Sequence, residues 1–439
     1  MEKDQQFGDE LKYSDRPIVR PGEDVLGRAP FALALARAID GMVLASDGFV
    51  IAINGSWGLG KTSVVELTLR FLAHLEMERA SNTTLLGDES PYPKNMTELE
   101  ELASSFDKVR DKITAYDELN LNVTAAQRNH QLGLFRSWLR DEDEANKADQ
   151  YWRLYRKIEG HRRTIQVRFS PWVIAGRAEL ASVLFSELAR ALGDRLGSDV
   201  KDAFASIISR LAELAPVAGA GLDLVTPYGA GKLFSAGVSW SSKVAASSIR
   251  GPTLDQLRDT LKRRLRDLKD QRILVIIDDL DRLMPSEAVE MVSLVKSLGD
   301  LPNVIYLLSY DENNLARLIK EGIKLDGREF LSKIVQYSVD LPIIGKDKMG
   351  ELFEADLISI AGSLTDEQSQ RLSAAWYFVI RHYLRTPRDV RLYANSIAMA
   401  WSAESDHVDI VDLLLIEALR LHERNLHDWV RDNLEELTQ

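Results

Sequence analysis

The sequence predicts an α/β fold in which a doubly wound parallel sheet carries helical insertions and is followed by a C-terminal helical domain. Short apolar runs suited to buried strands occur at residues 49–53, 164–169, 273–277, 304–308 and 335–341. Segments with helical spacing of apolar residues separate these runs, and strands that alternate with helices are typical of parallel sheets. From residue 349 to the C-terminus only helical spacing remains.

Two stretches interrupt this alternation. Charged residues dominate 80–160, which predicts a helical insertion whose charges face solvent. Residues 211–249 are small, apolar and rich in glycine, but Asp223 and Lys232 interrupt them. A membrane span needs roughly 18 uninterrupted apolar residues. We therefore expect a hairpin or an interaction loop at 211–249 and consider a membrane anchor unfavoured.

The composition limits the classes of protein to consider. A chain of 439 residues with 45% hydrophobic and 28% charged residues suits two or three soluble domains. The net charge of −12 argues against a whole-protein electrostatic grip on nucleic acid, although a local basic groove would still allow one. The absence of cysteine excludes disulfides, thiolate zinc sites and cysteine nucleophiles. With a polar N-terminus that lacks a secretory signal, these features favour a cytoplasmic location.

The strand at 49–53 leads into a glycine-rich loop, which reads Gly55-Ser56-Trp57-Gly58-Leu59-Gly60-Lys61-Thr62-Ser63. This is the G-x-x-x-x-G-K-[ST] phosphate loop of nucleoside-triphosphate-binding proteins, and every residue of it is a candidate for nucleotide binding. Glycines let backbone amides converge on a phosphate, and the following helix points its positive end there. We expect Lys61 to reach the β- and γ-phosphates and the Thr62 hydroxyl to ligate Mg²⁺. The alternative is a simple turn between strand and helix.

An acidic motif, Asp278-Asp279-Leu280-Asp281-Arg282, follows the apolar strand at 273–277. We expect Asp278 to hold Mg²⁺ through water and Asp279 to orient or deprotonate the attacking water. Alone, such a strand end is weak evidence, because many buried strands end in an acid that caps the next helix. Together with the phosphate loop upstream, it indicates nucleotide hydrolysis.

The acidic motif resembles the D-D-x-D-R signature of the KAP family of P-loop NTPases. Further blocks agree in order along the chain, so that the resemblance covers roughly residues 15–400. These blocks are Asp24-Val-Leu-Gly27-Arg28, Phe169-Ser-Pro-Trp172, Tyr310-Asp311, Lys333-Ile-Val-Gln336, Thr386-Pro387-Arg388 and Asn395.

The resemblance implies ATP as the nucleotide, an extra strand between the two Walker strands, and a large insertion there. It places Gly27 and Arg28 near the adenine end of the site. Arg282 or Arg388 would act on the γ-phosphate, within one subunit or across to a neighbour. The alternatives are an ion pair between Arg282 and a nearby acid, and capping of the chain after Pro387 by Arg388.

We expect the chain to divide into a polar lead-in at 1–22, a P-loop NTPase domain at 23–345 with insertions at about 80–160 and 211–249, and a C-terminal helical domain at 346–439. The protein would bind and hydrolyse ATP with Mg²⁺ and would form a homo-oligomer that depends on nucleotide. Hydrolysis would act as a conformational or assembly switch for a partner effector protein, for example in anti-phage defence. Two alternatives stay open. One is a nucleic-acid-stimulated motor whose basic helix at 254–268 lines a groove, and the other is a non-hydrolysing scaffold.

Overall fold

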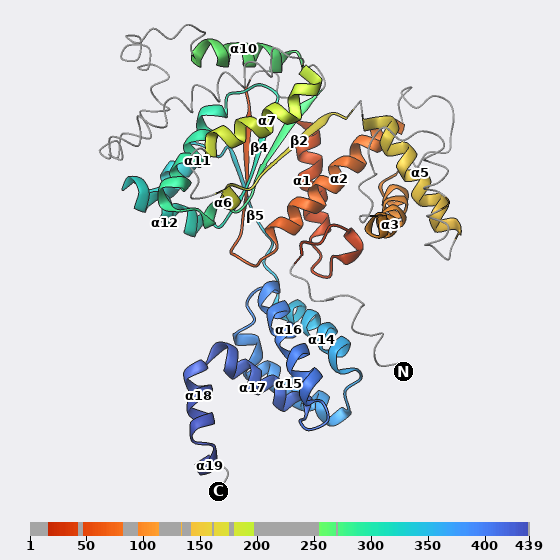
Figure 1. The fold of residues 1–439 in the computed structure, drawn as a ribbon, viewed down its shortest axis with the longest axis vertical. Coiled ribbons are helices and arrows are strands. Elements are labelled where there is room, and N and C mark those ends of the chain that lie inside the picture. Colours follow the sequence, from red (N-terminus) through yellow and green to blue (C-terminus); the bar gives the residue numbers. More distant parts are fainter. Residues whose placement is uncertain are drawn as a thin grey trace. The chain divides into compact units, whose positions relative to one another are not determined.

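The computed structural model describes residues 16–42, 47–81, 95–113, 133, 142–159, 162–174, 180–196, 254–268 and 271–437 (Figure 1). The insertion expected at 211–249 lies outside the described residues, as does much of the one at 80–160. The described residues fall into two compact units. The sheet unit comprises those of Pro30–Asn54 and Val65–Val339, and the loop unit those of Met1–Ala29, Gly55–Val64 and Asp340–Gln439.

A five-stranded sheet forms the centre of the sheet unit. Its strands are β1 (Phe49–Asn54), β2 (Thr164–Phe169), β3 (Arg272–Ile277), β4 (Val304–Tyr310) and β5 (Tyr337–Asp340), in the order β2-β3-β4-β1-β5. The pairs β2–β3, β3–β4 and β4–β1 are parallel. Because β4 separates β1 from β3, an extra strand lies between the two Walker strands, as the family resemblance implied.

Helices cover both faces of the sheet. One face packs against α7 (Leu180–Leu196), α10 (Leu254–Arg266), α11 (Pro285–Leu298) and α12 (Glu312–Ile323). Strand side chains alternate between faces, so Val275 and Tyr306 enter this core while Leu274 and Leu307 are buried on the other side. Helices α1 (Ala29–Gly41) and α2 (Lys61–Ser81) lie beside that second face (Figure 1). This arrangement is the doubly wound sheet predicted from the sequence.

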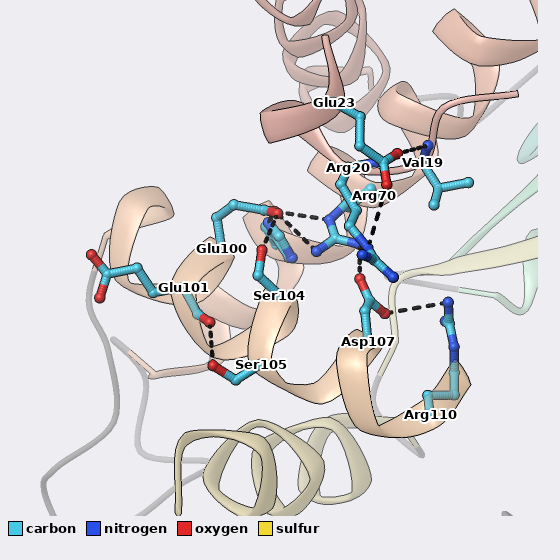
Figure 2. Close-up of polar contacts among 11 residues, drawn as sticks. Val19, Arg20, Glu23, Arg70, Glu100, Glu101, Ser104, Ser105, Asp107 and Arg110 are labelled. Carbon is cyan, nitrogen blue, oxygen red and sulfur yellow. Dashed lines mark hydrogen bonds and ion pairs between the residues drawn. The ribbon is translucent and has the colours of Figure 1, made fainter. Parts of the chain in front are cut away.

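The described part of the first insertion is helical, as predicted. Helices α3 (Met96–Ile113) and α5 (Glu142–Glu159) pack with the end of α2 around a second small core, in which the rings of Phe106 and Trp152 stack 5.5 Å apart. The charge pattern predicted that the charged residues of this insertion face solvent. Some of them do not. Arg70 of α2 donates to both carboxylate oxygens of Glu100 at 2.8 Å and to Asp107 at 2.5 Å (Figure 2). Partly buried ion pairs therefore join α3 to α2.

The C-terminal residues form a helical bundle in the loop unit. Its core gathers apolar residues such as Phe353, Tyr393 and Leu414. The bundle helices are α14 (Lys346–Ala361), α15 (Asp366–Phe378), α16 (Pro387–Glu404), α17 (Ile410–His422), α18 (Arg424–Asp432) and α19 (Leu434–Leu437). Shorter elements elsewhere are η1 (Pro21–Glu23), α6 (Pro171–Ile174), η3 (Leu280–Arg282), α13 (Gly327–Ser332) and η4 (Ile380–His382). Within the described ranges, no helix is both long and apolar enough to cross a membrane.

Candidate nucleotide site

The phosphate loop connects β1 to α2. Gly58 and Gly60 have φ values of +79° and +86°, a region that glycine enters without steric cost. The backbone N–H of Leu59 donates to the carbonyl of Ser56 at 3.3 Å, which closes the turn. Helix α2 then begins at Lys61 and continues for 21 residues, so its positive end lies at the loop. The glycines of the loop and the first residue of α2 thus have the local geometry that the phosphate-loop motif predicts.

Lys61 folds back on the loop. The residue is only 6% exposed, and its Nζ donates to the carbonyl oxygen of Gly55 at 2.8 Å and approaches that of Ser56 at 3.5 Å. A buried ammonium requires such acceptors. Because an ammonium has three donors, Lys61 can keep its bond to Gly55 and still donate to a phosphate oxygen.

Arg28 supports the loop from the N-terminal block. It is 3% exposed, its Nη1 donates to the carbonyl of Leu59, and its Nη2 donates to the carbonyl of Pro342 at 3.4 Å. Burial lowers the pKa of Arg28, while the charge of Asp24 raises it. Gly27, at φ +71°, makes the turn into α1. The sequence did not reveal the contact with Leu59, and a place for Arg28 near adenine stays a prediction.

The first turn of α16 lies against the phosphate loop. A Cβ added to Gly58 would lie 2.7 Å from the Oγ1 of Thr386 and 3.0 Å from the Cβ of Arg388. The guanidinium of Arg388 lies over the indole of Trp57, 4.6 Å from the ring centroid. Residues other than Arg388 cap the start of α16. Thr386 accepts from the N–H of Asp389 at 3.2 Å, and the Asp389 carboxylate accepts from Thr386 at 2.8 Å.

The acidic motif follows β3 in the sheet unit. The Oδ1 of Asp278 accepts the backbone N–H of Asp279 at 2.9 Å. Asp279 has φ +60° and ψ +37°, a left-handed conformation that aspartate tolerates better than most residues. Unfavourable backbone conformations of non-glycine residues cluster at functional sites. The role of Asp279 expected from the sequence stays a prediction, since Asn303 and Lys324 also have positive φ values.

Two contacts of Arg282 lie within the sheet unit. Its Nη2 lies 2.8 Å from the Oδ1 of Asp279, and the two side chains are 34% and 17% exposed. Its guanidinium also lies 5.5 Å from the ring centroid of Trp172 in α6. The structure thus contains an ion pair between Arg282 and a nearby acid, while an action of Arg282 on the γ-phosphate stays a prediction. The family block Phe169–Trp172 drew attention to Trp172 in the sequence, but the sequence did not show that this ring lies near Arg282.

Two other family blocks have structural contacts. The Oε1 of Gln336 accepts the N–H of Val50 at 2.7 Å, and the N–H of Gln336 donates to the carbonyl of Val50 at 3.1 Å. These bonds hold the start of β5 beside β1. Asp311 caps α12 by accepting from Asn313 at 3.0 Å and Asn314 at 3.2 Å. Both blocks therefore fix elements next to the Walker strands.

The residues expected to hold Mg²⁺ suit that ion. Thr62 is half-buried in the first turn of α2, and Asp278 is half-buried after β3. Both offer oxygen ligands, which Mg²⁺ prefers, and the ion commonly keeps waters and phosphate oxygens as its other ligands. In the described part of the chain, no group of three or more acidic or histidine side chains could hold a metal. A site with few protein ligands is the kind that these residues fit.

The basic helix α10 carries acidic partners. Lys262 donates to Asp300 at 2.5 Å, and Arg264 lies 3.9 Å from Asp267. Arg263 donates to the hydroxyl of Thr260 at 3.1 Å. These contacts reduce the positive charge that α10 could offer to nucleic acid.

Comparison with known proteins adds family evidence. The model of the KAP family P-loop domain matches residues 28–402. The phage T7 exclusion protein of Escherichia coli strain K12 is 26% identical over 430 residues, which cover 97% of this chain and 48% of that protein. The chain therefore spans about half the length of this relative.

Two solved structures also align with the chain. The ORC2 protein of Aeropyrum pernix has a TM-score of 0.37 at 12% identity, covering 93% of this chain and 71% of that one. The Walker-type ATPase of Pyrococcus abyssi has a TM-score of 0.37 at 12% identity, covering 97% and 79% respectively.

Proposed function

This chain belongs to the KAP family of P-loop NTPases, and from that premise we propose that it binds and hydrolyses ATP with Mg²⁺. The observation that carries the proposal is the phosphate loop itself. The positive φ values of Gly58 and Gly60 shape the loop so that its backbone N–H groups can face a phosphate. The buried Lys61 and the first turn of α2 add further donors for a triphosphate. The choice of ATP rather than GTP rests on the likeness to the KAP family.

We propose distinct roles for the charged residues. Lys61 binds the β- and γ-phosphates, and Asp279 orients the attacking water or takes its proton. Arg388 contacts the γ-phosphate, because its helix already meets the phosphate loop at Gly58. Arg282 holds the carboxylate of Asp279 through their ion pair. These assignments divide binding, water activation and charge stabilisation among separate side chains.

Magnesium completes the proposed site. Thr62 and Asp278 would be its protein ligands, the latter through water. When bound, the ion neutralises phosphate charge that develops during hydrolysis. Thr62 and Asp278 would supply two oxygens, which leaves other positions around the ion for phosphate and water.

We further propose that hydrolysis drives a switch in a homo-oligomer that controls a protein effector. The likeness to a phage exclusion protein supports a role in anti-phage defence. The phosphate loop, with Trp57 and Gly58, contacts the first turn of α16 at Thr386 and Arg388. A change at the loop can therefore reach the helical bundle.

Two measurements test this proposal. Titration with ATP should show Mg²⁺-dependent binding and turnover. Particle mass should rise when a non-hydrolysable ATP analogue is added. Tight binding without turnover would instead support the scaffold alternative. Turnover that depends on added DNA or RNA would support the motor, and a mass unaffected by nucleotide would contradict the assembly switch.

A further inference from the structure

Trp57 occupies a variable position of the phosphate-loop motif, so binding a phosphate does not by itself require an aromatic residue there. The side chain is 56% exposed. Its ring nevertheless has a specific neighbour, the guanidinium of Arg388, at 4.6 Å from the ring centroid. The loop thus contributes a side chain to the placement of an arginine that is distant in the sequence.

The location of Arg388 calls for such a neighbour. Pro387 is the first residue of α16, so Arg388 lies in the first turn, at the positive end of an 18-residue helix. A cation is electrostatically disfavoured there. The negative face of an indole attracts a guanidinium with an energy of comparable size. Trp57 therefore offsets the cost of placing Arg388 at this helix end.

Gly58 makes the contact geometrically feasible. A Cβ at this position would lie 2.7 Å from the Oγ1 of Thr386 and 3.0 Å from the Cβ of Arg388. Any larger residue would push the first turn of α16 away from the loop. The adjacent pair Trp57 and Gly58 thus combines an aromatic surface with room for the helix to approach it.

We propose that Trp57 is a positioning residue for Arg388. Its indole holds the guanidinium at the phosphate loop, so that Arg388 can act on the γ-phosphate while remaining in the first turn of α16. This inference rests on the proposed function and adds that the loop itself determines where Arg388 lies. Any effect of Trp57 on turnover is exerted through Arg388.

A double-mutant cycle tests the inference, using the full chain with Trp57→Leu, Arg388→Ala and the double variant. We expect Arg388→Ala to lower kcat about tenfold or more and Trp57→Leu to lower it about two- to fivefold. The double variant should match Arg388→Ala, because Trp57 has no guanidinium left to position. Trp57→Phe keeps an aromatic face and should recover most of the loss.

Tyr377→Leu is the matched control. Tyr377 is 55% exposed, belongs to the same bundle and has the guanidinium of Arg381 at 3.6 Å from its ring centroid. This variant removes a similar cation–π contact that does not involve the phosphate loop. It should leave kcat and ATP affinity unchanged.

The outcomes separate this inference from the proposed function. Losses that multiply fully in the double variant, or a Trp57→Leu protein with wild-type kcat, would overturn the positioning role. Urea unfolding of the same four proteins without nucleotide gives an independent readout of the contact. Additive changes in unfolding free energy would also overturn the role. A wild-type protein that neither binds nor hydrolyses ATP would overturn the proposed function, whatever coupling the unfolding cycle shows.

Discussion

The Nη2 of Arg282 lies 2.8 Å from the Oδ1 of Asp279, so the arginine that ends the acidic motif pairs with the carboxylate proposed to activate water. Asp279 also has a left-handed backbone conformation. The ion pair and the backbone together restrict where this carboxylate can lie. A positioned base needs such restriction, because proton transfer depends on hydrogen-bonding distance to the water.

Replacement of Arg282 should lower kcat more than it lowers ATP affinity. Arg282→Ala removes the ion pair with Asp279, and we expect kcat to fall about 10- to 100-fold with a smaller change in ATP affinity. Arg282→Lys keeps the charge but loses the planar fork, and should recover part of the rate. Steady-state kinetics together with ATP titration would measure both effects.

Mixing experiments decide whether Arg282 acts within its own chain. Because Arg282 pairs with Asp279 of its own chain, Arg282→Ala subunits mixed with Asp279→Asn subunits should show no more activity than the two variants measured separately. At every mixing ratio, specific activity should equal the weighted average of the two variants measured separately. Restored activity in the mixture would mean that Arg282 acts on a neighbouring subunit instead.

Gly58 should tolerate no side chain. Gly58→Ala introduces a Cβ at positive φ and 2.7 Å from the Oγ1 of Thr386, so we expect ATP affinity to fall at least about tenfold. Gly362→Ala is the control. Gly362 also has positive φ, at +77°, but an added Cβ would meet no atom within 4 Å.

Both variants should unfold at lower urea concentration, because both place alanine at positive φ. Only Gly58→Ala should lose ATP affinity. Equal affinities in the two variants would show that contact between the loop and Thr386 has no part in nucleotide binding.

Stability should depend on His74 at mildly acidic pH. His74 is fully buried in the sheet unit, and burial together with the nearby charge of Arg70 lowers its pKa from 6.5 to about 3. The folded protein therefore binds fewer protons than the unfolded chain between these values. The contribution of His74 is fully present above pH 6.5 and is lost as the pH falls toward 3. From pH 7 to 5 the free energy of unfolding should fall by about 2 kcal/mol through this residue.

Urea unfolding at pH 7 and pH 5 measures that dependence. His74→Phe keeps a ring but cannot take up a proton, so the decrease between the two pH values should be smaller by about 2 kcal/mol. His407→Gln, at an exposed position, should keep the wild-type decrease. An unaltered decrease in His74→Phe would show that His74 does not contribute.

The strands and most helices could be predicted because their apolar spacing is local. The run Ile273–Ile277 gave β3 to within one residue, and the run at 164–169 gave β2. The glycine pattern likewise predicted the phosphate loop that ends at Lys61, where α2 begins. Such features depend on neighbours in the sequence, and the sequence contains them directly.

Contacts between distant segments could not be predicted in the same way. Arg28 donates to Leu59, and Arg388 lies over Trp57, only because the chain brings separate blocks together. The charges near Asp107 suggested a solvated face, since a helical pattern does not show which acid will meet an arginine of another helix. The family blocks identified most of these residues, but their partners required the fold.

The central claim is that the phosphate loop binds ATP and that Asp279 acts on the water. The most direct test measures ATP Kd and kcat for wild type, Lys61→Ala and Asp279→Asn under identical Mg²⁺ conditions. We expect Lys61→Ala to lose affinity, because the ammonium neutralises phosphate charge directly. We expect Asp279→Asn to keep wild-type Kd and to lose turnover. Equal loss of binding in the two variants, or full turnover in Asp279→Asn, would contradict the central claim.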